Sequence, residues 1–129
     1  MMRILVVDDL ADAAVSLATM LRLAGHEAHV ALRGDQAVED AMTFRPHVLL
    51  VDIAMPGIGG IEVARRIRAS NGLQNTLVIA ITGFDGDDIR RRAWAAGIEH
   101  YLVKPFDADV LLSLLANHES QVARPSSHH

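Results

Sequence analysis

The sequence predicts a doubly wound α/β fold: a (βα)5 sandwich whose five-stranded parallel sheet lies between two layers of helices. Three observations predict it. Five short apolar runs alternate with five stretches of helical periodicity. The runs at residues 4–7, 48–51 and 77–81 are rich in Val, Ile and Leu, which is typical of strands buried on both faces. The connections between elements are short, as in repeated βα units.

The strands are predicted at residues 4–7, 27–31, 48–51, 77–81 and 101–103. Each is followed by a helical stretch, so the crossovers are expected to be right-handed and to place helices on both faces of the sheet. We expect the strand order 2-1-3-4-5, in which the first, third, fourth and fifth strands are neighbours.

The helices are predicted at residues 11–24, 35–44, 60–69, 87–96 and 107 to about 117. The first ends at Gly25 and the fourth at Gly97, because glycine is favoured just past a helix C-terminus. The second ends before Arg45-Pro46, because a residue that precedes proline disfavours helix.

The composition is that of one globular domain. Of 129 residues, 50% are apolar and 22% are charged, enough for a substantial core. We assign residues 1–120 to the domain and residues 121–129 to a disordered tail or an artificial remnant. The net charge of −4 argues against direct nucleic-acid binding, and no apolar run approaches membrane-spanning length. The absence of cysteine excludes disulfides and thiol chemistry and suits a cytoplasmic location.

Reactive polar residues stand where the predicted strands end. Asp8 and Asp9 follow the first strand, Asp52 the third, Thr82 the fourth and Lys104 the fifth. Because ligands of a doubly wound sheet bind beyond the carboxyl ends of its strands, we expect these side chains to line one crevice.

Three carboxylates in one crevice repel one another and need a cation. Hard oxygen donors in small number suit Mg²⁺, which also coordinates phosphate. Lys104, the only lysine among twelve basic residues, adds a compact positive charge. A carboxylate held by a metal and a lysine can attack phosphorus, and the Thr82 hydroxyl can hydrogen-bond a phosphoryl oxygen.

These residues belong to motifs that resemble the receiver domain of response regulators in two-component signalling, which has a flavodoxin-like fold shared with chemotaxis regulators. The resemblance covers residues 3 to about 117. It rests on the pair Asp8-Asp9, residues 52–57 with Gly60, Thr82-Gly83, and residues 101–106.

The resemblance implies that Asp52 accepts a phosphoryl group from a phosphohistidine on a sensor histidine kinase or phosphotransfer protein. Mg²⁺ would be bound by Asp9, Asp52 and the backbone carbonyl of Ala54, with Asp8 acting through a water. Lys104 would pair with the phosphoryl group or, before transfer, with Asp52, and the Lys104-Pro105 bond would be cis. Such a protein catalyses only its own phosphorylation and dephosphorylation.

The resemblance also implies a switch through Thr82 and Tyr101, in which phosphorylation draws the Tyr101 ring inward. The output face would comprise residues 87–96, 101–103 and 107–117, and would contact a downstream protein or a second phosphorylated copy in a homodimer. We expect no contact with nucleic acid or membrane. Arg90, Arg91 and Arg92 are interpreted as a solvated helix face, and Trp94 as a core residue.

Ala54 and Phe84 lie two residues past Asp52 and Thr82, at positions that modulate phosphoaspartate lifetime in this family. Neither side chain can hydrogen-bond a water, so slow self-hydrolysis is expected. A Mg²⁺-dependent aspartyl phosphohydrolase is a rival interpretation, but it would need a second acid where Ala54 stands. A flavin-binding module would need a phosphate-binding loop where Asp8 and Asp9 stand.

The remaining alternative concerns the whole protein. The chain is either a stand-alone receiver or the receiver part of a hybrid histidine kinase or larger regulator. The histidines His26, His29, His47 and His100 lie near strand 2 or near strand starts, and no metal is expected there.

Overall fold

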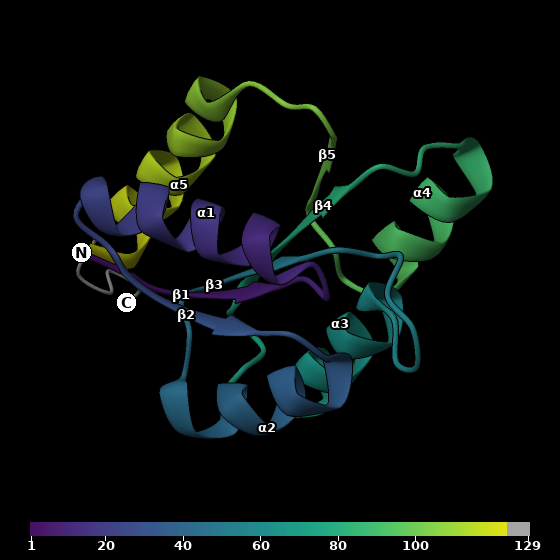
Figure 1. The fold of residues 1–129 in the computed structure, drawn as a ribbon. Helices are drawn as coiled ribbons and strands as arrows, with labels where there is room; N and C mark the ends of the chain where they lie inside the picture. The colour runs from purple at the N-terminus through teal and green to yellow at the C-terminus, as the bar shows by residue number, and fades with distance from the viewer. Residues whose placement is uncertain (124–129) are drawn as a thin grey trace.

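The computed structural model describes residues 1–123, which form one parallel sheet covered by helices (Figure 1). The strands are β1 (Arg3–Val7), β2 (Glu27–Ala31), β3 (Val48–Val51), β4 (Leu77–Thr82) and β5 (His100–Val103). Their order is β2-β1-β3-β4-β5, and every neighbouring pair is parallel. The predicted fold class and strand order are therefore confirmed.

The helices are α1 (Ala11–Leu23), α2 (Gly34–Phe44), α3 (Gly60–Ala69), α4 (Asp87–Ala95) and α5 (Ala108–Ala123). The first four agree with the predicted bounds to within one residue at each end. The fifth is longer than predicted and includes residues 121–123, which had been assigned to the tail. The sequence has no glycine or proline between Ala108 and Pro125, so no helix-breaking residue ends α5 earlier. The rest of the predicted tail, residues 124–129, lies outside the described residues.

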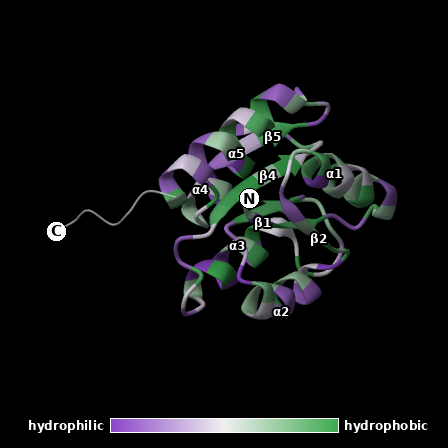
Figure 2. Cartoon of the chain, turned by 90° about the vertical axis from the view of Figure 1, so that its left-hand side faces the viewer, coloured by the Kyte–Doolittle hydropathy of each residue, from purple (hydrophilic) through white to green (hydrophobic). Residues whose placement is uncertain are grey.

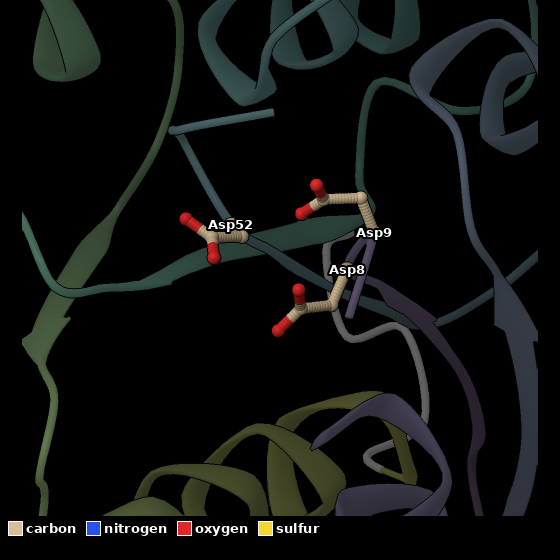
Figure 3. A group of neighbouring side chains, drawn as sticks. All are labelled: Asp8, Asp9 and Asp52. Atoms are coloured by element: carbon tan, nitrogen blue, oxygen red, sulfur yellow. The ribbon is translucent and has the colours of Figure 1, made fainter. Parts of the chain in front are cut away.

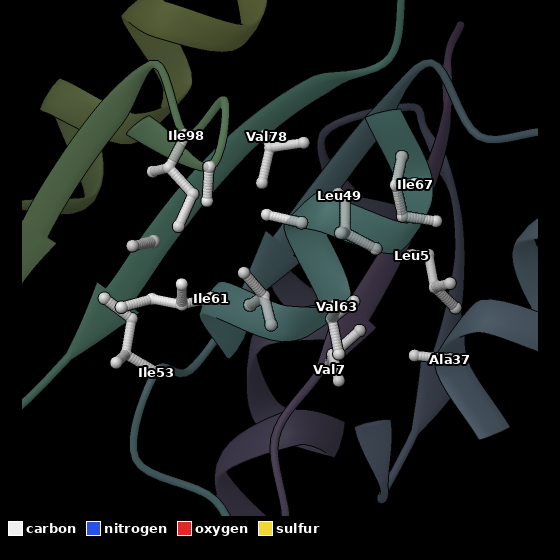
Figure 4. Close-up of a cluster of buried hydrophobic side chains, with 14 of the residues drawn as sticks. Leu5, Val7, Ala37, Leu49, Ile53, Ile61, Val63, Ile67, Val78 and Ile98 are labelled. Carbon is white, nitrogen blue, oxygen red and sulfur yellow. The ribbon is translucent and has the colours of Figure 1, made fainter. Parts of the chain in front are cut away.

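Alternating side chains of the strands build two cores, one on each face of the sheet. Leu5, Leu49 and Val78 stand in register and pack on the face covered by α2, α3 and α4 (Figure 4). Ile4, Val48 and Leu77 pack on the opposite face with α1 and α5. β3 and β4 are buried along their whole length, which explains their nearly unbroken apolar sequences.

The loop after β3 is held tightly against the start of α3. A Cβ atom added to Gly60 would lie 2.6 Å from the Asp52 carbonyl oxygen and 2.9 Å from Ile53 Cα, so only glycine fits. Gly57 has a φ of 73°, which suits the second central position of a turn that has Pro56 at its first. These two glycines set the path of the chain around Asp52.

Two further observations concern one peptide bond and the possibility of a membrane-spanning helix. The Lys104-Pro105 peptide bond is cis, as the resemblance implied. Among residues 1–123, no helix is both long enough and apolar enough to cross a bilayer.

Candidate functional site

Three aspartates from two adjacent strands meet at the carboxyl edge of the sheet. Asp8 and Asp9 follow β1, and Asp52 follows β3. One carboxylate oxygen of each lies within 4.8 Å of the others, and the three side chains surround a common space (Figure 3). Asp8 and Asp52 are buried, whereas Asp9 is exposed. The predicted acidic crevice is present.

Backbone hydrogen bonds orient the two buried carboxylates. Asp8 Oδ1 accepts a bond of 3.0 Å from the Leu10 N–H, and Asp52 Oδ1 accepts one of 3.0 Å from the Ala54 N–H. In each case the N–H two residues further along the chain bonds to Oδ1 and leaves Oδ2 of the same carboxylate available for a cation. Ala54 thus contacts Asp52 through its N–H, while the metal-binding role of its carbonyl stays a prediction.

Lys104 provides that cation from the end of β5. Its Nζ lies 3.0 Å from Asp8 Oδ2 and 3.3 Å from Asp52 Oδ2. The resemblance implied the second contact, and the structure adds the first. Burial lowers the pKa of Lys104, but the ion pairs with Asp8 and Asp52 outweigh this effect and raise the pKa above its usual value. Lys104 is therefore cationic at neutral pH.

One ammonium group does not balance three carboxylates. Asp9 has neither a hydrogen bond nor an ion pair to any other side chain in the described part of the chain, so the site keeps negative charge on its open side. Three carboxylates with mixed burial are a donor set that fits Mg²⁺, which binds few protein oxygens and retains waters.

Thr82 and Tyr101 form a hydrogen-bonded path away from the acidic group. Thr82 is fully buried at the end of β4, and its Oγ1 accepts a bond of 3.3 Å from the Phe84 N–H. The Tyr101 hydroxyl donates a 2.7 Å bond to the Phe84 carbonyl. Thr82 and Tyr101, the two predicted switch residues, thus both contact the backbone of Phe84, on the loop between β4 and α4.

The Tyr101 ring already lies inward, with 8% of its surface exposed. The Arg90 guanidinium stacks 4.5 Å from the ring centroid, and Arg90 is held by Asp85 at 2.6 Å. Tyr101 is thus buried in this conformation, and its turn on phosphorylation stays a prediction. Sequence reasoning missed Asp85, because its pairing with Arg90 spans a loop and a helix start.

The surface of α4 differs from expectation at Trp94, and Arg90 is partly buried against Tyr101 rather than fully solvated. Trp94 is 49% exposed, so its assignment to the core was wrong. Ala93 and Ala96 face the core instead, and Trp94 falls on the outer side of this short helix. Arg91 pairs with Asp88 on the same helix, in agreement with a solvated charged face.

Comparison with known proteins identifies the family. A family model described as the response regulator receiver domain matches residues 4–116. The chain belongs to the response regulator receiver domain family. The chain is thus a receiver domain of two-component signalling.

Curated relatives of this receiver are longer proteins. The transcriptional regulatory protein PrrA of Mycobacterium leprae is 36% identical over 122 residues, which cover 95% of this chain and 50% of PrrA. The DNA-binding response regulator MtrA of Mycolicibacterium paratuberculosis is 36% identical over 111 residues, which cover 86% of this chain and 48% of MtrA. The chain spans about half the length of the curated relatives it matches.

Solved structures of receivers match almost end to end. The chemotaxis protein CheY4 of Vibrio cholerae superposes with a TM-score of 0.85 at 28% identity, covering 91% of this chain and 98% of that one. The BeF3-activated receiver domain of RstA from Klebsiella pneumoniae has a TM-score of 0.82 at 27% identity, covering 90% and 97%. The predicted receiver fold is confirmed.

Proposed function

We propose that this receiver accepts a phosphoryl group on Asp52 from a phosphohistidine of a sensor histidine kinase or phosphotransfer protein. The observation that carries the proposal is the position of Asp52. It is a buried carboxylate whose Oδ2 lies 3.3 Å from Lys104 Nζ, beside two carboxylates from the adjacent strand. No other aspartate of the site combines burial, a lysine contact and a place on the loop after β3.

Each residue of the site has a defined part in this reaction. An Asp52 oxygen forms the new bond to phosphorus while the bond to the donor histidine breaks, and the imidazole leaves with the bonding electrons. Lys104 compensates charge on the phosphoryl oxygens, and the Thr82 hydroxyl turns from Phe84 to donate to one of them. Asp9, Asp52 and the Ala54 carbonyl would hold Mg²⁺, with Asp8 acting through a water. Bound Mg²⁺ supplies the positive charge that lets an anionic phosphoryl group approach three carboxylates.

The chain is proposed to act on no substrate other than its own Asp52, which it phosphorylates and dephosphorylates. Signal output is proposed through α4, β5 and α5, because Thr82 and Tyr101 connect Asp52 to this face through the Phe84 backbone. The occupant of that face is a downstream protein or a second phosphorylated copy.

The length of the relatives favours one of the two alternatives for the whole protein. Because the relatives named as transcriptional or DNA-binding regulators are about twice as long, we propose that this receiver works as the regulatory part of a larger regulator. Direct contact between the receiver and nucleic acid is not expected at a net charge of −4, and that expectation stays a prediction, as does the cytoplasmic location.

Intact mass after incubation with Mg²⁺ and a small acyl phosphate tests the assignment. We expect the unmodified sequence to gain one phosphoryl group and Asp52→Ala to gain none. Asp12→Ala is the matched control, because Asp12 is an exposed acid on α1 outside the triad, and it should still be phosphorylated. Equal labelling of Asp52→Ala, or no labelling of the unmodified chain with Mg²⁺ bound, would contradict the proposal.

A further inference from the structure

A cavity with several basic side chains in its lining lies at the opposite end of the sheet from Asp52. It has a volume of about 430 Å³ and is lined by Arg3, Arg45, His47, His118 and their neighbours. Arg3 begins β1, His47 precedes β3, and His118 lies on α5. Figure 2 looks onto this end of the molecule, where the N-terminus lies near the centre of the view.

The two arginines are anchored by backbone carbonyls and have no acidic partner. Arg3 Nε donates bonds of 3.0 Å to the carbonyls of Phe44 and Arg45, and Arg45 Nη1 donates one of 3.2 Å to the Asn71 carbonyl. Neither forms an ion pair with any carboxylate of residues 1–123. A guanidinium has five N–H donors, so each arginine keeps several available. The Arg45 guanidinium lies close against Gly72, which has a φ of 83°.

The two histidines add ring N–H groups that can donate hydrogen bonds into the same cavity. His47 Nδ1 accepts a 2.9 Å bond from the Arg3 N–H, which requires the neutral ring to carry its hydrogen on Nε2. His118 Nε2 is buried and finds no hydrogen-bond partner within residues 1–123. Burial lowers the pKa of His47, and the charges of Arg3, His118 and the N-terminus act in the same direction, against Glu119. His47 therefore donates as a neutral group at neutral pH.

The balance of charge in this cavity favours an anion. Glu119 acts on His47 in the opposite sense to these charges, and it is already paired with the N-terminal ammonium group. Two guanidinium groups that line one cavity without a carboxylate repel each other, and an oxyanion would relieve that repulsion. Planar guanidinium groups bind phosphate oxygens in pairs.

We propose that this cavity is a binding site for a small phosphate-bearing molecule. Its volume lies in the range of small-molecule sites. Because the chain has a net charge of −4, a long polyanion would be repelled by the rest of the surface, whereas a small one needs only this cavity. The site is independent of Asp52 and does not depend on the function proposed above.

Titration with inorganic pyrophosphate, followed by amide NMR of the full chain, tests the site. The titration is run without Mg²⁺ so that the three carboxylates repel the probe from the Asp52 site. We expect saturable shifts centred on Arg3, His47, Thr76 and His118 at about pH 7.5, above the ordinary histidine pKa of about 6.5. Shifts centred on Asp8 and Asp52, or no saturable shift at millimolar probe, would overturn the proposal.

Variants of the chain distinguish a specific pyrophosphate site from general attraction of the anion to surface arginines. Arg45→Gln combined with His118→Gln should weaken pyrophosphate binding about tenfold or more, because it removes charge-assisted hydrogen bonds. Arg33→Gln is the matched control, since it removes one exposed arginine elsewhere and should leave binding unchanged. Equal weakening by the control would refute a specific site. If the double variant is unfolded, His118→Gln alone should still weaken binding several-fold, and unchanged binding by it would also count against the site.

Discussion

At the scale of single residues, Ala54 and Phe84 present apolar side chains on the loops that follow β3 and β4. They line a cavity of about 340 Å³ together with Ile53, Ile61 and Ile89 and with the charged residues Glu62, Arg65 and Arg92. Phe84 is 55% exposed, so its ring stands at the mouth of this cavity rather than in the core. A water that approaches a phosphoryl group on Asp52 from this side meets no hydrogen-bonding side chain at either position.

We therefore expect Ala54→Asn combined with Phe84→Glu to shorten the lifetime of phosphorylated Asp52. The new side chains can hydrogen-bond the attacking water, and one such bond corresponds to about tenfold in rate. Loss of the phosphoryl mass with time after donor removal measures the rate. Ala54→Val with unchanged Phe84 is the control, because it adds volume without a donor or acceptor. An unchanged lifetime in the polar double variant would show that these positions do not govern hydrolysis.

At the scale of elements, one arginine joins three parts of the chain. Arg68 of α3 donates through Nη1 to the carbonyls of Gln74 and Thr76, at 2.9 and 2.6 Å, just before β4. Its Nη2 donates to the Gly97 carbonyl at 2.7 Å and pairs with Glu99 at 2.9 Å, just before β5. Gly97 has a φ of 93°, and a Cβ there would clash with the Arg68 side chain. The junction thus fixes where β4 and β5 begin.

We expect Arg68→Ala to lower the free energy of unfolding by about 2 kcal/mol, because several carbonyls lose a charged donor at a partly buried position. Arg66→Ala is the control on the same helix. Within residues 1–123, Arg66 pairs with the half-exposed Glu62 alone, and such surface pairs contribute at most about 1 kcal/mol. Denaturant unfolding of both variants measures the difference. Equal destabilisation would mean that the Arg68 bonds to the carbonyls contribute nothing beyond a surface pair.

At the scale of the whole molecule, the acidic site opposes folding unless a cation is bound. Asp8, Asp9 and Asp52 come from segments more than forty residues apart in the chain, and folding forces their carboxylates to within 4.8 Å. Lys104 offsets part of this repulsion through its contacts with Asp8 and Asp52. Asp9 lacks such a contact within residues 1–123, so its negative charge is the part of the repulsion that Lys104 leaves uncompensated.

We expect Mg²⁺ to stabilise the folded chain, by about 2.7 kcal/mol at a concentration one hundred times its Kd. Asp9→Ala should lose most of this gain, and without Mg²⁺ it should be at least as stable as the unmodified chain, because one repulsive charge is gone. Asp12→Ala should keep the full Mg²⁺ effect, since Asp12 lies outside the triad. Thermal unfolding with and without Mg²⁺ measures both effects. An undiminished Mg²⁺ effect in Asp9→Ala would exclude Asp9 as a ligand.

The sequence alone determined the architecture and the residues that gather at the site. Apolar runs of strand length alternate with helical periodicity, and a parallel arrangement of five such units allows few topologies. Once the strands are parallel, their carboxyl ends must share one edge, so Asp8, Asp52, Thr82 and Lys104 had to converge there. The Pro56-Gly57 pair is also a local turn signal in the sequence, and Gly57 has the positive φ that such a turn needs.

Only the tertiary structure decided which hydrogen bonds and ion pairs these residues form and which side chains are buried. Lys104 contacts Asp8 as well as Asp52, Tyr101 lies inward on the Phe84 carbonyl, and Trp94 lies outside the core. The cavity lined by Arg3, Arg45, His47 and His118 joins residues that no sequence pattern connects. These outcomes depend on side-chain rotamers and loop paths, which are set by contacts between segments distant in sequence and carry no periodic signal of their own.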